Sequence, residues 1–196
     1  MAKLYFYYAS MNAGKSTALL QADFNYRERG LGTLLLTAAA DDRHGTGNIA
    51  SRIGVSAAAT VFDAATDLRA VVEAVAAAPL ACVLVDEAQF LCRAQVHALA
   101  SVADDLGIPV LCYGLRTDFQ GVPFEGSLWL LALADVLSEI KAVCRCGRKA
   151  TMNLRVGTDG VAVTEGRQTE IGGNDRYIAM CRRHFVAAFA DAATKR

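Results

Sequence analysis

The sequence predicts an α/β fold in which an open, mostly parallel β-sheet is followed by a small second unit. The sheet is predicted because short, continuous apolar segments alternate with segments whose apolar residues recur at helical spacing. Helices between such strands imply right-handed crossovers and parallel pairing. The second unit is predicted because helical periodicity fades after about residue 137, where Cys, Gly and Arg cluster. We therefore expect two units, residues 1–137 and residues 138–196, the latter ending in a helix.

Each element of the first unit follows from its own residues. Continuous apolar runs are typical of parallel strands buried on both faces, and they predict strands over residues 4–8, 33–37, 81–85 and 110–113. A helix over residues 16–29 is expected because two arginines in its last turn and Gly30 after it favour a helix end. Apolar side chains at the i, i+3, i+4, i+7 spacing predict two further helices, over residues 65–78 and 94–106.

Composition and charge exclude several classes of protein. Of the 196 residues, 54% are hydrophobic and 20% are charged, which excludes a disordered tail. Lys plus Arg and Asp plus Glu both number 20, so no net positive charge favours a nucleic acid, and the near-neutral surface permits self-association. No segment reaches the roughly 18 apolar residues of a membrane span, and we interpret the apolar N-terminus as a strand rather than a leader. We expect a cytoplasmic protein with neither nucleic-acid nor membrane partners.

A phosphate-binding loop is predicted directly after the first strand. The phosphate-loop pattern, with Ala in place of its first Gly, occurs at Ala9, Ser10, Met11, Asn12, Ala13, Gly14, Lys15 and Ser16. The backbone N–H groups of such a loop and the following helix N-terminus attract phosphate. Lys15 would then reach the β and γ phosphates, and the Ser16 hydroxyl would bind Mg²⁺. The alternative interpretation is a Gly-Lys-Ser turn that binds nothing.

Two carboxylates follow the strand over residues 81–85. Asp86 and Glu87 would lie at the carboxyl edge of the sheet, where open parallel sheets bind their ligands. Asp86 fits the Mg²⁺ sphere, and Glu87 could act as general base on an attacking hydroxyl or water. Asp41 and Arg43, after the second strand, could bring a further carboxylate and a cation to this edge. The alternatives are a solvated acidic turn and an exposed charged loop.

A metal site is predicted near the C-terminus. Three thiols and an imidazole occur in two short clusters, formed by Cys144 with Cys146 and by Cys181 with His184. Zinc favours four-coordinate tetrahedral sites of Cys and His supplied as two pairs. Because four protein ligands leave no position for a substrate, the zinc would be structural and would tie the end of the chain to the Cys144 turn. The alternative is a set of reduced thiols without metal.

The chain resembles the type II thymidine kinases, the cellular thymidine kinase family shared by bacteria and animals. The resemblance is carried by segments in the right order over nearly the whole chain, residues 10–17, 85–90, 114–119, 144–146 and 171–184. The most specific of them are Val-Asp-Glu-x-Gln-Phe at residues 85–90 and Gly-Gly-x-Asp-x-Tyr at residues 172–177. Ala9 stands where many members have Gly, and the metal set is Cys₃His where animal members use four cysteines.

The resemblance implies a RecA-like P-loop domain followed by a zinc-bearing domain with a lasso-like loop. It implies transfer of the γ-phosphate of ATP, bound with Mg²⁺, to the 5′-hydroxyl of deoxythymidine, and also of deoxyuridine, in nucleotide salvage. Glu87 falls on the catalytic base of the family. The remaining ATP and Mg²⁺ contacts would come from residues 9–16, Asp41, Arg43, Asp86, Ala88 and Gln89.

The resemblance also implies how the nucleoside is bound and how the enzyme is regulated. Phe119 and Tyr177 would enclose the thymine ring, and residues 168–172 would form the lasso, which reads the base largely through backbone groups. The implied substrate-binding residues are Phe90, Leu115, Phe119, Gln168, Thr169, Glu170, Ile171, Gly172 and Tyr177. Most members are homotetramers that the end product dTTP inhibits, and we expect both properties here.

Two other functions are compatible with parts of the sequence. One is a phosphate-loop ATPase or GTPase switch, although the Asn-Lys-x-Asp element that reads guanine is absent from the chain. The other is a zinc-ribbon nucleic-acid module, because basic residues surround the metal ligands at Arg145, Arg148, Lys149, Arg182 and Arg183. A nucleoside-independent ATPase rate would favour the first, and steeply salt-dependent nucleic-acid binding would favour the second.

Overall fold

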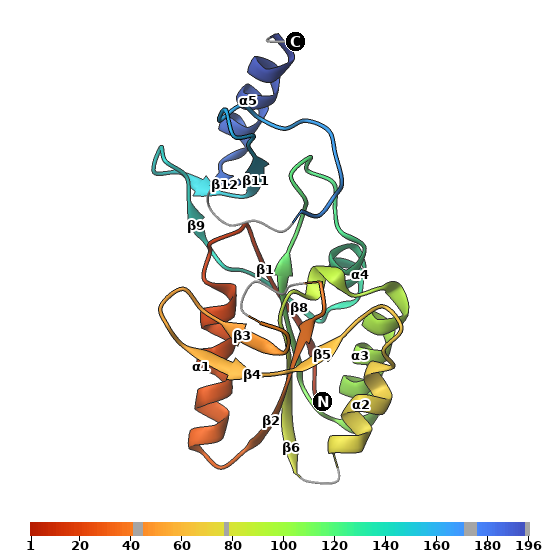
Figure 1. Ribbon diagram of the computed structural model, residues 1–196. Coiled ribbons are helices and arrows are strands. Elements are labelled where there is room, and N and C mark those ends of the chain that lie inside the picture. Colours follow the sequence, from red (N-terminus) through yellow and green to blue (C-terminus); the bar gives the residue numbers. More distant parts are fainter. Residues whose placement is uncertain (41–44, 77–78, 171–175, 195–196) are drawn as a thin grey trace.

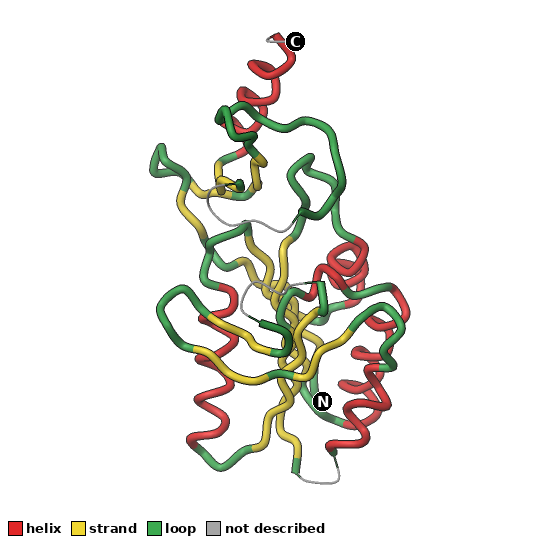
Figure 2. Tube along the Cα trace, viewed as in Figure 1, coloured by secondary structure: helices red, strands yellow, loops and turns green. Residues whose placement is uncertain are grey.

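A six-stranded parallel β-sheet forms the centre of the computed structural model, which describes residues 1–40, 45–76, 79–170 and 176–194 (Figures 1 and 2). Its strand order is β5-β2-β6-β7-β1-β8, and every neighbouring pair is parallel. The strands are β1 (Leu4–Ala9), β2 (Gly32–Ala38), β5 (Thr60–Phe62), β6 (Leu80–Val85), β7 (Val110–Leu115) and β8 (Val136–Glu139). The α/β class and the four expected strands are confirmed.

Helices cover both faces of this sheet, so that the strands are buried between two layers (Figure 1). On one face α1 (Lys15–Glu28) packs its leucines against inward-facing residues of β2, β6 and β7. On the other face lie α2 (Leu68–Val75), α3 (Arg93–Leu106) and α4 (Glu125–Leu133). Because side chains alternate along a strand, Leu84 faces the α1 side while its neighbours Val83 and Val85 face the other.

Helix α2 is shorter than the expected range of residues 65–78. It begins at Leu68 because the side chain of Asp67 accepts a hydrogen bond from the backbone N–H of Ala70 at 3.1 Å. The preceding residues form a separate turn in which the Thr66 hydroxyl donates to the Asp63 carboxylate at 2.8 Å. The expected range also extends over residues 77–78, which lie outside the described residues.

Several elements have no counterpart in the expectations. They are the hairpin of β3 (Asn48–Ala50) and β4 (Ser56–Ala58), the short strand β5, the 3₁₀ turn η1 (Ala88–Phe90) and helix α4. The segment Glu125–Leu133 is apolar around its whole circumference, so it shows no helical periodicity that could identify it. The expected boundary between residues 137 and 138 falls inside β8, and the central sheet itself continues to Glu139.

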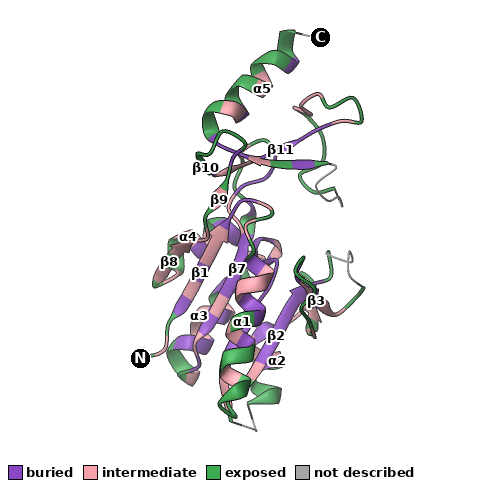
Figure 3. Cartoon of the chain, turned by 90° about the vertical axis from the view of Figure 1, so that its left-hand side faces the viewer, coloured by how far each residue is buried: buried purple, intermediate pink, exposed green. Residues whose placement is uncertain are grey.

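The second unit stands at the carboxyl edge of the sheet and ends in helix α5 (Arg182–Thr194), beyond which lies the C-terminus (Figure 1). It contains two antiparallel ribbons, β9 (Ala142–Val143) with β10 (Lys149–Ala150) and β11 (Met152–Arg155) with β12 (Tyr177–Met180). A small core of its own includes Leu154, Met180 and Phe185. Buried residues dominate the central strands, whereas α5 is mostly exposed (Figure 3). In the described part of the chain no helix is long and apolar enough to cross a membrane.

Two glycines let neighbouring elements approach η1 closely. A Cβ atom on Gly126, in the first turn of α4, would lie 2.5 Å from the carbonyl oxygen of Ala88 and 2.7 Å from that of Leu91. A Cβ atom on Gly114, in β7, would lie 3.0 Å from the backbone nitrogen of Gln89. The backbone of η1 is therefore held between β7 and α4.

We predict that Gly126→Ala lowers the free energy of unfolding by about 1–3 kcal/mol, because α4 or η1 must move to admit the methyl group. Helix propensity alone would give the opposite sign, a stabilisation of up to about 1 kcal/mol. Urea denaturation of the two proteins measures the difference. An unchanged or increased stability would contradict the close approach of α4 to η1.

Candidate functional site

The phosphate-binding loop connects β1 to α1 at the carboxyl edge of the sheet. Its turns use two left-handed residues, Asn12 with φ 63° and Gly14 with φ 87°, and Gly14 is the N-cap of α1. Ala9 is the last residue of β1 and is 4% exposed. Because a strand residue has an extended backbone that any side chain allows, the loop needs no glycine at position 9.

The loop is held from inside and from the second unit. Lys15 folds back, and its Nζ donates to the carbonyl oxygen of Ser10 at 3.1 Å. The backbone N–H of Met11 donates to Oδ1 of Asn153, in β11, at 2.7 Å. The Nδ2 of the same Asn153 donates to the carbonyl oxygen of Thr117 at 3.0 Å. One asparagine therefore links the loop, the segment after β7 and the second unit.

Asp86 lies directly after β6 and is 4% exposed. Its Oδ2 accepts a hydrogen bond from the Ser16 hydroxyl at 3.0 Å, and its Oδ1 is buried without a hydrogen-bond partner among the described residues. Burial, and next the neighbouring Glu87 carboxylate, raise the pKa of Asp86 to about 7, while the Ser16 hydrogen bond opposes the shift. A buried carboxylate with an unsatisfied oxygen beside a serine hydroxyl suits a hard cation such as Mg²⁺.

Glu87 adopts a conformation that is rare for its residue type. Its φ of 51° is left-handed, which costs a non-glycine residue about 1–3 kcal/mol and is typical of functional sites. The side chain is 9% exposed, and its Oε2 accepts a hydrogen bond from Nε2 of Gln89. Oε1 of Gln89 in turn accepts from the backbone N–H of Leu115 at 3.0 Å.

Two cavities meet at Glu87. The phosphate-loop cavity has a volume of about 1,020 Å³, part of it open to solvent, and is lined by Met11, Asn12, Gly14, Lys15, Ser16, Thr17, Thr37, Asp86, Glu87, Leu115 and residues 48–53. The second, apolar cavity has a volume of about 550 Å³, part of it open to solvent. Met11, Glu87 and Leu115 line both cavities.

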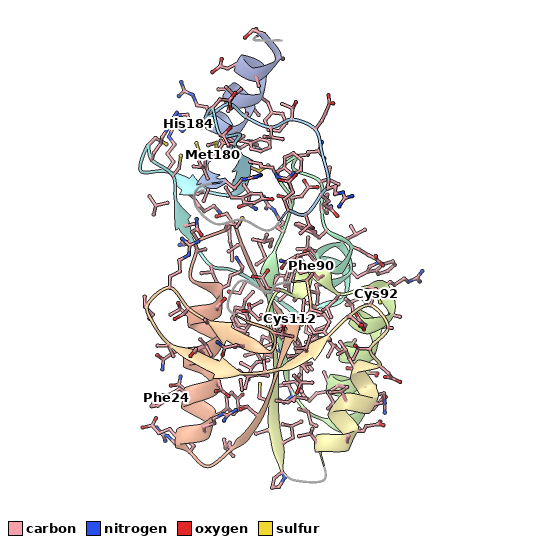
Figure 4. All side chains as sticks on the ribbon, in the orientation of Figure 1. Phe24, Phe90, Cys92, Cys112, Met180 and His184 are labelled. Atoms are coloured by element: carbon pink, nitrogen blue, oxygen red, sulfur yellow. The ribbon has the colours of Figure 1, made fainter. Side chains whose placement is uncertain are left out.

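The apolar cavity brings together residues that are far apart in the sequence. Its expected members are all present among the described residues, namely Phe90, Leu115, Phe119, Gln168, Thr169, Glu170 and Tyr177. Phe90, in η1, lies near the carboxyl edge of the sheet, well below His184 of the second unit in the view of Figure 4. The lining also includes Met11, expected as a phosphate contact, and Thr117 and Asp118, which lie in the 114–119 segment of the resemblance. The sequence did not indicate Ala40, Phe124 and Asn153, because a single residue outside a motif has no pattern of its own.

Not every expected contact residue lies at a cavity. Ala88 is fully buried in the core, and Gln89 lines the apolar cavity rather than the phosphate-loop cavity. Ala9, Ser10 and Ala13 shape the loop without lining either cavity. Asp41, Arg43, Ile171 and Gly172 fall outside the described residues.

Arg155 fixes the segment that closes the apolar cavity. It is 1% exposed, its Nε donates to the Tyr177 hydroxyl at 3.0 Å, and its Nη2 donates to the carbonyl oxygen of Gln168 at 3.1 Å. The guanidinium stacks 3.7 Å from the centre of the Phe119 ring. The Tyr177 hydroxyl donates to the carbonyl oxygen of Glu170, and Gln168 Nε2 donates to Asp118 Oδ2. Side chains of β11, of β12 and of the segment after β7 therefore hold residues 168–170 over the cavity.

The four expected metal ligands converge in the second unit. The ligand atoms of Cys144, Cys146, Cys181 and His184 all lie within 4.8 Å of one another. Cys146 Sγ and Cys181 Sγ are 3.9 Å apart, and Cys144 Sγ is 3.3 Å from His184 Nδ1. Tetrahedral Zn²⁺ with Zn–S bonds of about 2.3 Å needs sulfur atoms about 3.8 Å apart. A hydrogen bond from the Cys146 backbone, and next the contact with His184, lower the pKa of Cys144 to about 6, which favours the thiolate that a metal requires.

Comparisons with known proteins identify relatives of this chain over its full length. The family model described as thymidine kinase matches residues 2–185. A thymidine kinase of Novosphingobium aromaticivorans is 71% identical over 189 residues, which are 96% of this chain and 98% of that protein. One of Zymomonas mobilis is 64% identical over 187 residues, 95% of this chain and 97% of that protein. One of Coxiella burnetii is 57% identical over 187 residues, 94% and 95% of the two chains.

The raised pKa of Asp86 predicts a pH-dependent stability. Because the folded protein binds this proton more tightly than the unfolded chain, the contribution of Asp86 to stability is greatest below about pH 4 and is lost as the pH rises to about 7. The free energy of unfolding should therefore decrease less in Asp86→Asn than in the wild type between about pH 4 and pH 7. The two decreases should differ by about 1–3 kcal/mol. Urea denaturation at several pH values tests this, and equal slopes in both proteins would contradict it.

The geometry of the cysteine–histidine cluster predicts that the purified protein contains about one zinc ion per chain. Removal of the ion by a chelator, or the substitution Cys181→Ser, should unfold the second unit, because structural zinc contributes on the order of 10 kcal/mol to folding. Metal analysis and thermal denaturation provide the measurements. Cys92→Ser, outside the cluster, serves as the matched control. Well under one zinc per chain in a fully folded protein would refute the metal site.

Proposed function

The chain belongs to the thymidine kinase family, and we propose from this premise that it transfers the γ-phosphate of ATP to the 5′-hydroxyl of deoxythymidine. The observation that carries the proposal is the position of Glu87, which lines both the phosphate-loop cavity and the apolar cavity. A base at such a junction can contact an acceptor hydroxyl on one side while a donor phosphate lies on the other.

The donor would bind at the phosphate-loop cavity. Its phosphates would lie against the backbone N–H groups of the loop and the N-terminus of α1, with the Lys15 ammonium close to the β and γ phosphates. Ser16 and Asp86 would hold Mg²⁺, and the unsatisfied Asp86 Oδ1 supports that assignment. When bound, Mg²⁺ neutralises phosphate charge. Asp41 and Arg43 are proposed to act at the same phosphates.

The acceptor would bind in the apolar cavity. Phe119 and Tyr177 offer aromatic surface to a pyrimidine ring, and residues 168–170 offer backbone groups to its polar edge. Deoxyuridine differs from deoxythymidine only by the absence of a methyl group, so the same aromatic and backbone groups could contact its ring. We therefore propose that deoxyuridine is also phosphorylated.

In the transfer step Glu87 would accept the proton of the 5′-hydroxyl as its oxygen forms a bond to the γ-phosphorus. The bond between the γ-phosphorus and the oxygen of the β-phosphate breaks, and ADP leaves. The protein contributes position and charge rather than a covalent intermediate. Residues 168–170, held by Arg155, would exclude water from the acceptor side.

Four further properties belong to the same proposal. We propose a homotetramer, because exposed apolar side chains on α4 and the edge strand β8, such as Leu128 at 54% and Leu137 at 48%, suit burial against other copies. We propose inhibition by dTTP, which carries both the base that fits the apolar cavity and the phosphates that suit the loop. We propose that the enzyme acts in the cytoplasm, where ATP is supplied, and that its zinc is structural.

We predict that Glu87→Gln lowers kcat at least about 100-fold with little change in ATP affinity, because the amide cannot accept the proton. The measurement is transfer of labelled γ-phosphate from ATP and Mg²⁺ to a panel of nucleosides. Labelled dTMP from the wild type, lost in the variant, would support the reaction and the base. Glu28→Gln, an exposed substitution at the end of α1, is the matched control.

Free labelled phosphate formed without nucleoside would instead favour an ATPase and contradict the proposal. A Glu87→Gln variant that retained most of its kcat would remove Glu87 from the role of base. Substrate competition between deoxythymidine and deoxyuridine in the same assay measures the breadth of the acceptor site.

A further inference from the structure

Gln89 is buried, with 2% of its surface exposed, and its side-chain amide makes one hydrogen bond in each direction. Nε2 donates to Oε2 of Glu87, and Oε1 accepts from the backbone N–H of Leu115 at 3.0 Å. The side chain thus bridges the turn that carries Glu87 and the end of β7. Both partners line the phosphate-loop cavity, but Gln89 itself lines only the apolar cavity.

The direction of the amide follows from its partners. A backbone N–H can only donate, so Leu115 must face the carbonyl oxygen of the amide rather than its nitrogen. The NH₂ group is then directed to Glu87, whose Oε2 accepts its hydrogen bond. A rotation of the amide by 180° would break both hydrogen bonds, and the arrangement therefore has a single orientation.

The backbone around Gln89 is also confined. A Cβ atom on Gly114 would lie 3.0 Å from the nitrogen and 3.0 Å from Oε1 of Gln89, and one on Gly126 would lie 3.0 Å from its carbonyl oxygen. Both neighbours are glycine, so β7 and α4 approach the residue as closely as backbone atoms allow. Gln89 is therefore packed between β7 and α4. Such a support suits a side chain that holds the Glu87 carboxylate in place.

We propose that Gln89 is a positioning residue that orients the Glu87 carboxylate toward the acceptor hydroxyl, rather than a contact to the nucleotide. The inference rests on the proposed function, because it presupposes that Glu87 is the base. Glu87 begins a tight turn in a left-handed conformation, and the hydrogen bond from Gln89 restrains the orientation of its carboxylate. Misplacement of a reacting group by about 1 Å can lower a rate about 100-fold.

Two substitutions separate the two hydrogen bonds. Gln89→Glu keeps an acceptor for the Leu115 N–H but has no donor for Glu87, whereas Gln89→Met has a similar length and loses both. In single-turnover transfer of labelled γ-phosphate to deoxythymidine, we expect each variant to lower the rate about 10- to 100-fold. The KM for ATP should stay within about threefold of the wild type, because Gln89 does not line the phosphate-loop cavity. Gln21→Met, an exposed substitution on α1, is the matched control.

A double-mutant cycle provides the decisive readout. In the Glu87→Gln background there is no base left to position, so Gln89→Met should change the remaining rate less than about twofold. A merely structural Gln89 would lower the rate equally in both backgrounds, and that result would overturn the proposal. So would a transfer rate within twofold of the wild type for Gln89→Glu, or a selective rise in the KM for ATP.

The outcomes remain informative if one variant fails. If Gln89→Met does not fold, Gln89→Glu alone and combined with Glu87→Gln carries the same cycle. Failure of the proposed function has a separate signature, because the wild type would then form no labelled dTMP. If only the positioning role fails, the wild type still forms labelled dTMP. The effect of a Gln89 substitution on the transfer rate is then the same whether residue 87 is Glu or Gln.

Discussion

The parallel direction of the central strands is the constraint on which the rest of the structure depends. Because neighbouring strands run the same way, the ends of β1, β6 and β7 open at one edge of the sheet. That edge receives the phosphate-binding loop from β1, the Asp86–Glu87 pair from β6 and Leu115 from β7. The second unit stands on the same edge, and Asn153 joins it to the loop. The two cavities are the space left between these pieces.

The candidate site is built at a cost in stability that the core offsets. Asp86 is a buried carboxylate with an unsatisfied oxygen, Glu87 has a left-handed backbone, and the Arg155 guanidinium is enclosed by protein. Fully buried leucines, valines and phenylalanines on both faces of the sheet supply the opposing free energy. Groups that disfavour folding thus gather where ligands would bind, as expected when geometry at a site matters more than local stability.

Sequence reasoning was most successful where a pattern repeats or a donor set is narrow. Continuous apolar strands, the spacing of α3 and the four metal ligands are all of this kind, and the structure brings those ligands together. It failed for α4, whose apolar surface has no period, and for Asn153, whose contact with Met11 spans 142 positions of the chain. The motif groups Gln89 with the predicted nucleotide contacts, and the structure adds that its side chain is hydrogen-bonded to Glu87 and Leu115.

Strand β11 contributes two of the links described above, and their spacing has an evolutionary consequence. Asn153 and Arg155 are two positions apart, so the alternation of a strand directs both to one face, toward the loop and toward the lasso segment. Loss or gain of one residue between them would turn one of the two away. Relatives of this chain should therefore keep the length of β11 and these two side chains, with insertions and deletions restricted to the flanking turns.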